Sequence, residues 1–436
     1  MPHAIKVDLY RLAWPAVLAM VVHHLFRIND QFFIAPVGIE AQAAVAVGSM
    51  VSISLLAFGE MVGVGTMAIS ARRFGEGNVA AGHATIRRGV RLGMFVGVVL
   101  AVAVLSGLPW LCEQLIPGAE NELERQYCTD YLSWIAGGMV VIAAVQVIDQ
   151  SFLAMRDSRT PLVMQCLAVA TNALLNWLLV PILEVKGVAI ATVASRAIAM
   201  VLSLWVFKLK GVGSIFDASG IGAPVSRILR IGFPTCIAVG IYSLVYQVIV
   251  ATTIKEFGPA ARSALGIGFG IETIFYCLYW GLGTAVASLV GRYLGEGNLE
   301  KTLALTRLAV RVNLLLGLLI CGTFLVGGEA MVRILSGDET VIAVNVEYLF
   351  FMAFAQPFQA LQVSFDHALI GAGRTLPVMI GSVLMNCLRI PLASALALTW
   401  GLALPGVWWA INATTLGKCI WSFVLYRSRR WLHTRV

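Results

Sequence analysis

Long apolar runs separated by short polar segments dominate the chain. Stretches such as Leu92–Leu105 are continuously apolar, whereas membrane strands alternate in polarity over about ten residues. A helix crosses the hydrocarbon with about 20 predominantly apolar residues. The pattern therefore predicts an all-α integral membrane protein with twelve transmembrane helices. The expected spans are 12–36, 41–71, 89–111, 129–155, 161–183, 188–207, 229–254, 259–291, 303–327, 342–370, 376–399 and 404–426.

The composition agrees with this pattern. Of the 436 residues, 59% are hydrophobic and only 12% are charged, about half the charged share of an ordinary soluble domain. A disordered chain would be polar and rich in charge. Both a soluble globular protein and a disordered one are thereby excluded.

The basic residues predict how the chain is oriented. Of its 31 Lys and Arg residues, 22 fall in loops on the side of the N-terminus, five fall on the other side, and four lie within spans. Positively charged loops stay in the cytoplasm, so both termini are expected there, in an inner (plasma) membrane. The first apolar run is too long for a signal-peptide core, which predicts an uncleaved first span. Topology also accounts for the net charge of +8, and nucleic acid is not an expected partner.

The second half of the chain repeats the first. Ala71–Asn78 returns as Gly291–Asn298 at an offset of 220 residues, and both copies contain Gly-Glu-Gly-Asn, which is typical of a helix end and turn. Six spans separate equivalent points, so both halves enter the membrane in the same direction, as in many transporters. We expect an N-terminal lobe at 1–210, a cytoplasmic linker at 211–228 and a C-terminal lobe at 229–436. The glycines and serines of the linker predict flexibility.

Several motifs in order resemble one family. Asp30–Gly38 is similar to the Asp-x-x-Phe-Val-x-x-Leu-Gly stretch of multidrug and toxic compound extrusion (MATE) transporters, and the Gly-x-Gly-Asn turns, the Asn172-x-x-x-Asn176 pair before Gly187–Thr192, and Gly406–Ala410 also fit that family. The resemblance implies antiport of organic, often cationic, amphiphilic compounds against protons or sodium ions, by a chain that is no enzyme, needs no cofactor and acts as a monomer. The phosphate-binding pattern Gly-x-x-x-x-Gly-Lys-Ser/Thr does not occur, so no nucleotide is expected.

Ionisable residues within spans are functional candidates, because each is costly to place in hydrocarbon. The family's coupling carboxylate in the first span corresponds to Asp30, and burial favours the neutral form that would let it carry a proton. Arg27 lies one helical turn earlier and could instead hold Asp30 in a static ion pair. The sequence leaves both interpretations open. The full set is Arg27, Asp30, Glu60, Asp149, Arg196, Glu272, Arg389 and Lys418.

The resemblance also implies an ion-coupling site in the N-terminal lobe, formed by Asp30, Asp149, Asn172, Asn176 and Thr192. Many family members carry Asp where this chain has Asn176, and Asp149 could restore the missing charge. Amide oxygens can still coordinate a sodium ion, so a site at Asp30, Asn172 and Asn176 is possible, with no other metal expected. Hydrogen bonding between helices is the alternative role of the two asparagines.

Four residues are candidates for substrate binding: Asp30, Arg27, Gln247 and Glu272. Glu272 could bind a cationic substrate, or it could pair with Arg389 or Lys418. The cysteines Cys112 and Cys128 flank one outer loop; a disulfide is possible there, although two unrelated apolar cysteines are the favoured interpretation.

Two other functions are weighed against an exporter. A flippase for a lipid-linked precursor would need a strongly cationic cavity, whereas the basic residues within the spans lie beside several acids. A membrane-embedded prenyl transferase would need clustered aspartates for magnesium and diphosphate, and no such cluster occurs in the sequence.

Overall fold

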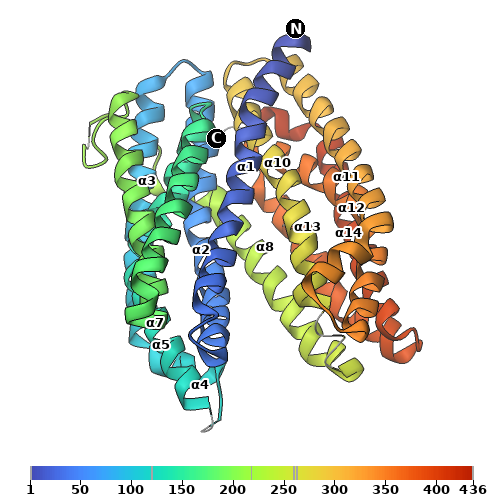
Figure 1. The fold of residues 1–436 in the computed structure, drawn as a ribbon. Helices are drawn as coiled ribbons and strands as arrows, with labels where there is room; N and C mark the ends of the chain where they lie inside the picture. The colour runs from blue at the N-terminus through green and yellow to red at the C-terminus, as the bar shows by residue number, and fades with distance from the viewer. Residues whose placement is uncertain (1, 119–120, 218, 259–260, 262–263, 435–436) are drawn as a thin grey trace. The chain divides into compact units, whose positions relative to one another are not determined.

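The described chain is built from helices. The computed structural model describes residues 2–118, 121–217, 219–258, 261 and 264–434 (Figure 1), and these form no strand. The all-α prediction is therefore confirmed. The main helices are α1 (Pro2–Ile34), α2 (Ile39–Gly75), α3 (Val79–Ser106), α4 (Leu108–Leu115), α5 (Glu122–Gly137), α6 (Met139–Ala154), α7 (Arg159–Leu209), α8 (Val225–Thr252), α10 (Phe269–Gly295), α11 (Leu299–Leu335), α12 (Glu339–Gly371), α13 (Thr375–Ser394) and α14 (Ala403–Arg427).

The predicted spans all fall on helical segments, except that part of the run 259–291 lies outside the described residues. Eight described helices are long and apolar enough to cross a membrane by themselves, and the bent pair α5 and α6 makes a ninth. Helix α7 is 51 residues long and covers two predicted spans, on either side of a backbone break at Glu184, with φ 49° and ψ −125°. Helices α1 and α14 cover two further predicted spans and are not among the eight.

The repeated Gly-Glu-Gly-Asn motif forms the same turn twice. Gly77 and Gly297 have φ values of 76° and 70°, a conformation that glycine adopts without strain. In each copy the asparagine that follows caps the next helix: Asn78 accepts from Ala81 N at 3.0 Å, and Asn298 accepts from Lys301 N at 2.9 Å. The predicted helix end and turn is confirmed, and each motif is both the end of one helix and the start of the next.

Contacts divide the chain into two compact units. The N-terminal unit is Leu18–Cys236, and the C-terminal unit combines Met1–Val17 with Ile237–Val436. The divisions fall inside α1 and α8 rather than in the segment 211–228, so each of these helices contributes its first part to one unit and its second part to the other. Within the C-terminal unit, Tyr293 donates its hydroxyl to Asp8 at 2.7 Å, which fixes the start of α1 there.

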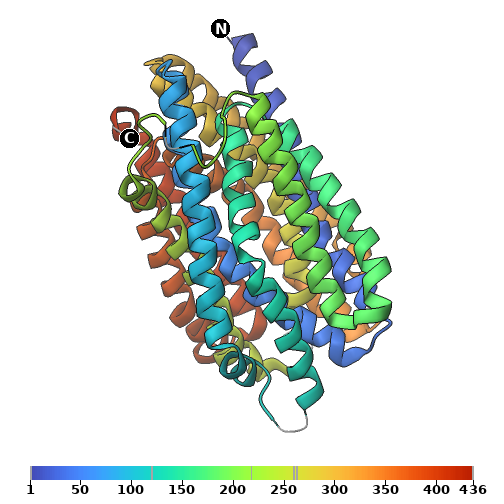
Figure 2. The same cartoon turned by 90° about the vertical axis from the view of Figure 1, so that its left-hand side faces the viewer.

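In the N-terminal unit, α2, α3 and α6 pack on one another, and α7 follows beside α5 and α6 (Figure 2). The linker folds back onto α3 of this unit. Arg87 donates to the carbonyl of Val212 at 2.7 Å and to Ser219, and Arg88 donates to the carbonyls of Gly222 and Ala223 at 3.0 and 2.9 Å. Two arginines of α3 therefore bind four backbone oxygens of this segment, and its expected flexibility stays a prediction.

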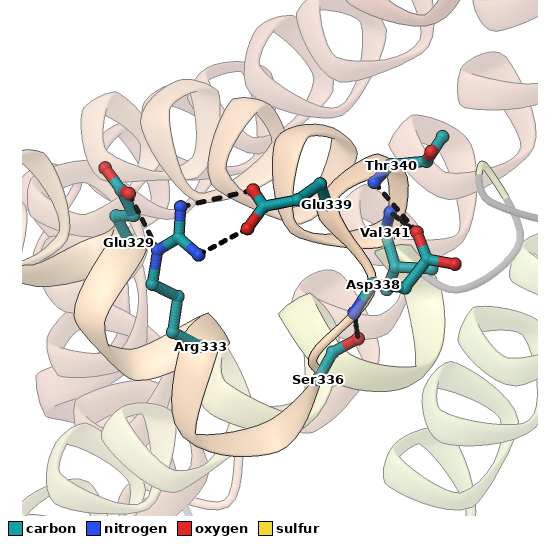
Figure 3. A network of polar contacts seen from close by, with 7 residues as sticks. All are labelled: Glu329, Arg333, Ser336, Asp338, Glu339, Thr340 and Val341. Atoms are coloured by element: carbon teal, nitrogen blue, oxygen red, sulfur yellow. Dashed lines mark hydrogen bonds and ion pairs between the residues drawn. The ribbon is translucent and has the colours of Figure 1, made fainter.

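In the C-terminal unit, an ionic cluster closes the turn between α11 and α12 (Figure 3). Arg333 donates to Glu329 at 2.9 Å and to Glu339 at 2.8 Å. Asp338 caps α12 by accepting from the backbone N–H groups of Thr340 and Val341 at 2.8 and 3.1 Å. The Arg333 guanidinium holds the pKa of Glu339 below its usual range.

Candidate ion-binding site

Asp30 is the centre of a buried polar cluster in the N-terminal unit. Its side chain on α1 is 6% exposed. Oδ1 accepts from Asn176 Nδ2 at 2.9 Å, and Oδ2 accepts from Thr192 Oγ1 at 3.0 Å. Asn176 and Thr192 lie on α7 on opposite sides of the break at Glu184, so both predicted spans that make up α7 contribute one donor to the same carboxyl group.

A second layer of amides surrounds this carboxyl group. Asn172 Oδ1 accepts from Asn29 Nδ2 at 2.6 Å and from Asn176 Nδ2 at 3.4 Å, and Asn172 Nδ2 donates to Thr192 Oγ1 at 3.3 Å. Asn29 was missed from the sequence. Its only signal was its position directly before Asp30 in an apolar span. We call the cluster of Asn29, Asp30, Asn172, Asn176 and Thr192 the Asp30 cradle.

One oxygen of the Asp30 cradle has no donor. Among the described residues, Asn176 Oδ1 is buried and accepts no hydrogen bond. A buried amide oxygen without a partner is unusual and costs free energy. It lies on the same side chain that donates to Asp30, so the cradle contains a carboxylate and a free oxygen ligand. That donor set fits a sodium ion, which prefers oxygen, and it equally fits a proton shared between the two groups.

Arg27 does not neutralise Asp30. Its side chain is exposed, and no ion pair joins it to Asp30 within 4.0 Å. The guanidinium that acts on Asp30 belongs to Arg196, which is 7% exposed and lies 4.5 Å from the centre of the Phe26 ring. Of the two interpretations that the sequence left open, the static pair between Arg27 and Asp30 is not formed.

Asp149 lies in a neighbouring cluster and makes no hydrogen bond within the Asp30 cradle. It accepts from Gln165 Nε2 at 2.9 Å. Asp149, Gln165 and Arg196 line a cavity of about 10 Å³, large enough for about one water molecule. Gln165 Oε1 is buried there without a donor in the described chain, as expected of a group that binds ordered water. The charge of Arg196 acts on both Asp149 and Asp30, so the two acids share one buried cation.

The predicted substrate-binding residues of the second half, Gln247 and Glu272, belong to the C-terminal unit. Glu272 is 5% exposed and is enclosed by donors: Tyr348 Oη at 2.6 Å, Gln359 Nε2 at 2.9 Å and Gln356 Nε2 at 3.3 Å. Within the part of the chain that the structure describes, it forms no ion pair within 4.0 Å, so the expected alternative of direct pairing with Arg389 or Lys418 is not found. Gln247 is exposed on α8.

Cys112 and Cys128 are both free and fully buried. They belong to one apolar cluster of the N-terminal unit. Their thiols interact with each other, so the two cysteines are neighbours, and the interpretation of two unrelated apolar cysteines stays a prediction.

The order and spacing of these helices correspond to a known family. A family model described as MatE matches residues 15–178 and 234–394. The chain belongs to the MatE family. The two matched segments begin at Pro15 and Pro234, one in each half of the chain, so the family match also contains the repeat found in the sequence. MatE proteins are membrane transporters rather than enzymes, which places this chain among multi-pass transport proteins.

Relatives of known name extend over most of this MatE chain. A probable multidrug resistance protein NorM of Thermotoga maritima is 26% identical over 98% of this chain and 93% of its own length. The multidrug export protein MepA of Staphylococcus haemolyticus is 23% identical over 87% of this chain and 83% of its own. A protein of Shewanella oneidensis named FAD transporter is 24% identical over 80% of this chain and 77% of its own.

Solved structures show the same fold. A multidrug resistance MATE family transporter in an outward-facing conformation gives a TM-score of 0.91 at 19% identity, covering 98% of this chain and 96% of that one. A transporter of the MOP superfamily from Pyrococcus furiosus gives a TM-score of 0.90, also at 19% identity and with the same coverage. The two-lobe helical fold predicted from the sequence is thereby confirmed.

Proposed function

We propose that this MatE protein is a multidrug exporter that exchanges its cargo for protons or sodium ions. The observation that carries the proposal is the Asp30 cradle, a buried carboxyl group whose two oxygens are held by donors from two spans. The names of the relatives as multidrug resistance and export proteins support the cargo class. The lobes are taken to be 1–210 and 229–436, joined by 211–228, with alternating access between them.

Proton binding at Asp30 would rearrange the cradle. The ionised carboxylate can accept from both Asn176 and Thr192, as the distances of 2.9 and 3.0 Å show. A protonated carboxyl group carries an O–H donor and needs an acceptor. Asn176 Oδ1, which has no donor in the described chain, supplies that acceptor after its amide turns. The contact between α1 and α7 therefore has two arrangements, and the proton selects between them.

A sodium ion would act on the same atoms. Asp30, Asn172 and Asn176 offer carboxylate and amide oxygens, and Asp149 with Arg196 contributes charge from the adjoining cavity. Cargo binding to the ionised state would then compete with ion binding. In this cycle the ion enters from outside, neutralises Asp30 and resets the lobes after the cargo has left.

The cargo expected from the family resemblance is a cationic amphiphile, and the protein is placed in the inner membrane as a monomer with both termini in the cytoplasm. Asp30 is a carboxylate that such a cation could approach. Arg27 and Gln247 remain candidate contacts because both side chains are exposed.

The experiment uses the purified full chain in liposomes with proton and sodium gradients imposed separately. A panel of fluorescent organic cations, beginning with ethidium, serves as cargo. We expect the cargo to move in the direction opposite to the flow of one of the two ions. The gradient of the other ion should have no effect on cargo movement. A rate of cargo transport that depends on neither gradient would overturn the proposal.

A further inference from the structure

Two basic side chains are buried in the C-terminal unit. Arg389 on α13 is 1% exposed and Lys418 on α14 is 8% exposed. Both lie well inside their helices, Thr375–Ser394 and Ala403–Arg427. Charged side chains at this depth of a membrane are costly and are kept mostly where they bind a counter-charge or a ligand. Neither residue is used by the ion-coupling cycle above.

Arg389 is held by neutral oxygens. Its Nε donates to Thr414 Oγ1 at 2.8 Å, Nη1 donates to Tyr246 Oη at 3.0 Å, and Nη2 donates to Thr415 Oγ1 at 3.4 Å. Among the described residues no carboxylate lies within 4.0 Å of the guanidinium. These hydroxyl groups fix its orientation without cancelling its positive charge, and an arginine has five N–H donors in all.

Lys418 lacks even neutral partners. In the described part of the chain its ammonium group makes no hydrogen bond and no ion pair within 4.0 Å. Its Nζ lies 5.5 Å from the centre of the Tyr242 ring. Two charges act on it, the repulsive one of Arg389 and the attractive one of Asp366. The Asp366 carboxylate already accepts from Ser422 at 2.6 Å and from Gln362 at 3.1 Å. A basic side chain that is this little exposed within a predicted membrane span, and that no protein group of the described chain binds, is a candidate for contacting a ligand.

One aromatic pair connects the two cations. The rings of Tyr242 and Tyr246 have centres 4.9 Å apart. Arg389 lies 5.3 Å from the Tyr246 ring, and Lys418 faces Tyr242. The positive charges of Arg389 and protonated Lys418, each of which faces one of these rings, repel each other in a medium of low dielectric constant. An anion that contacts both would relieve this repulsion, and the tyrosine faces would receive a flat apolar group next to it.

Two acids of the same unit, Glu272 and Asp366, do not form ion pairs with Arg389 or Lys418. Glu272 is bound by Tyr348, Gln356 and Gln359, and its charge acts on the region of Arg389 only from beyond ion-pair distance. Asp366 is bound by Ser422 and Gln362. The positive charge near the two tyrosines is therefore left for a group from outside the chain.

We propose that Arg389 and Lys418, with Tyr242 and Tyr246, form a subsite for the anionic group of an aromatic or amphiphilic cargo. The group is a carboxylate or a phosphate, both of which suit a guanidinium and an ammonium. This inference rests on the proposed export function and extends its cargo from organic cations to organic anions and zwitterions. The same anionic group could belong to a free solute or to a lipid headgroup.

The first test measures binding without transport. Carboxyfluorescein is titrated against the purified full chain in neutral detergent, and fluorescence anisotropy reports the dissociation constant. The native chain is expected to bind the dye, and Lys418→Met is expected to weaken binding about tenfold or more, the cost of losing a charge-assisted contact. Lys418→Arg should retain most of the affinity. Lys301→Met removes an ammonium from the same unit at an ion pair with Glu296 and should leave binding as in the native chain.

The second test measures cargo preference in liposomes of phosphatidylcholine. Carboxyfluorescein and ethidium are transported side by side, and the ratio of the two rates is compared between variants. Lys418→Met should lower the anion-to-cation ratio about tenfold, and Arg389→Met should lower it in the same direction. A ratio unchanged in both variants, or a native chain that binds no carboxyfluorescein, would overturn the inference.

The two proposals fail in different ways. Ethidium transport that ignores both ion gradients would contradict the export function, whereas lysine-dependent dye binding would still support the subsite. Normal ethidium export with no lysine-dependent anion binding would contradict the subsite alone. Adding phosphatidylglycerol to the dye titration separates the sources: competition through Lys418 assigns the subsite to a lipid headgroup, and its absence, with binding intact, assigns it to a soluble anion.

Discussion

Asn176 donates its amide nitrogen to Asp30 Oδ1 at 2.9 Å, across 146 positions of the chain. The contact joins α1 to the first predicted span of α7, and Thr192 adds a bond from the second span to the other carboxylate oxygen at 3.0 Å. One carboxyl group thus holds three predicted spans together within a single unit. A change in the charge of Asp30 alters its hydrogen bonds to both spans of α7 at once. Ion binding can control the arrangement of helices through such a group.

The first prediction concerns this charge. Asp30→Asn keeps the shape of the side chain and removes its ability to bind a proton or to neutralise sodium. We expect gradient-driven efflux to be lost, while the amount of protein in the membrane stays at the native level. Efflux is measured in loaded liposomes. Glu329→Gln, which neutralises an exposed acid of the C-terminal unit, serves as the control, and normal ion-driven efflux by Asp30→Asn would remove the carboxylate from the mechanism.

The second prediction concerns Thr192. Thr192→Val keeps the shape and removes the hydroxyl that donates to Asp30 Oδ2. A hydrogen bond to a charged group contributes about 1.5–3 kcal/mol, so we expect the ion concentration for half-maximal efflux to change about tenfold or more. Thr171→Val is the matched control, since the Thr171 hydroxyl on the same helix donates to the backbone carbonyls of Leu167 and Ala168. Equal effects of the two variants would contradict a role for the cradle.

Much of the fold was predictable because a membrane-spanning helix requires a long run of apolar residues, which the sequence shows directly. The repeat predicted two equivalent turns, and Asn78 and Asn298 cap the two following helices. The division inside α1 and α8 could not be predicted in the same way. The apolar pattern along one helix does not specify which bundle each part of the helix packs against, because it marks burial and not the identity of the neighbour.

The candidate site was predicted in part. The structure brings together Asp30, Asn172, Asn176 and Thr192, while Asp149 lies in the adjoining cavity with Gln165 and Arg196. Residue spacing predicted that Arg27 could face Asp30, but the rotation of α1 about its axis decides which neighbours it meets. That rotation is set by packing between helices, which spacing along one helix does not specify.

The third prediction concerns the linker. Arg87→Ala removes donors from the carbonyls of Val212 and Ser219. The Val212 carbonyl is buried and loses its partner, whereas Ser219 is exposed and its carbonyl can bind water instead. We expect a loss of about 1–3 kcal/mol of local stability and faster tryptic cleavage near Lys210. Limited proteolysis followed by mass spectrometry measures the cleavage rate. Arg307→Ala, at an exposed position of α11, is the control, and an unchanged cleavage rate in Arg87→Ala would show that the linker is held by other contacts.

The fourth prediction is a pH dependence. Burial of Asp157 raises its pKa, but hydrogen bonds from Thr160 and the Lys210 ammonium at 2.9 Å outweigh that effect and hold the pKa below its ordinary value of 3.8. A lowered pKa in the folded state means that the stabilisation is complete above the unfolded value and disappears as the pH falls through the folded value. Asp157→Asn should therefore cost about 1 kcal/mol at pH 7, and this cost should shrink as the pH falls below 3.8.

Thermal unfolding in detergent between pH 2 and 7 measures the difference between the native chain and Asp157→Asn. Lys210→Met removes the other partner, and the double variant isolates the coupling between them. A difference that stays constant down to the lowest pH would mean that the charge of Asp157 does not contribute to stability.

The last prediction concerns close packing of α10 and α12 in the C-terminal unit. A Cβ atom added to Gly371 would lie 2.2 Å from the backbone oxygen of Ala287, whereas one added to Gly322 would meet nothing within 4 Å. Alanine favours a helix over glycine by about 1 kcal/mol, so Gly322→Ala should be neutral or slightly stabilising. Gly371→Ala must instead push two helices apart, and overpacking costs about 1–3 kcal/mol or more. We expect a lower unfolding temperature only for Gly371→Ala, and equal temperatures for the two variants would show that α10 and α12 can separate without cost.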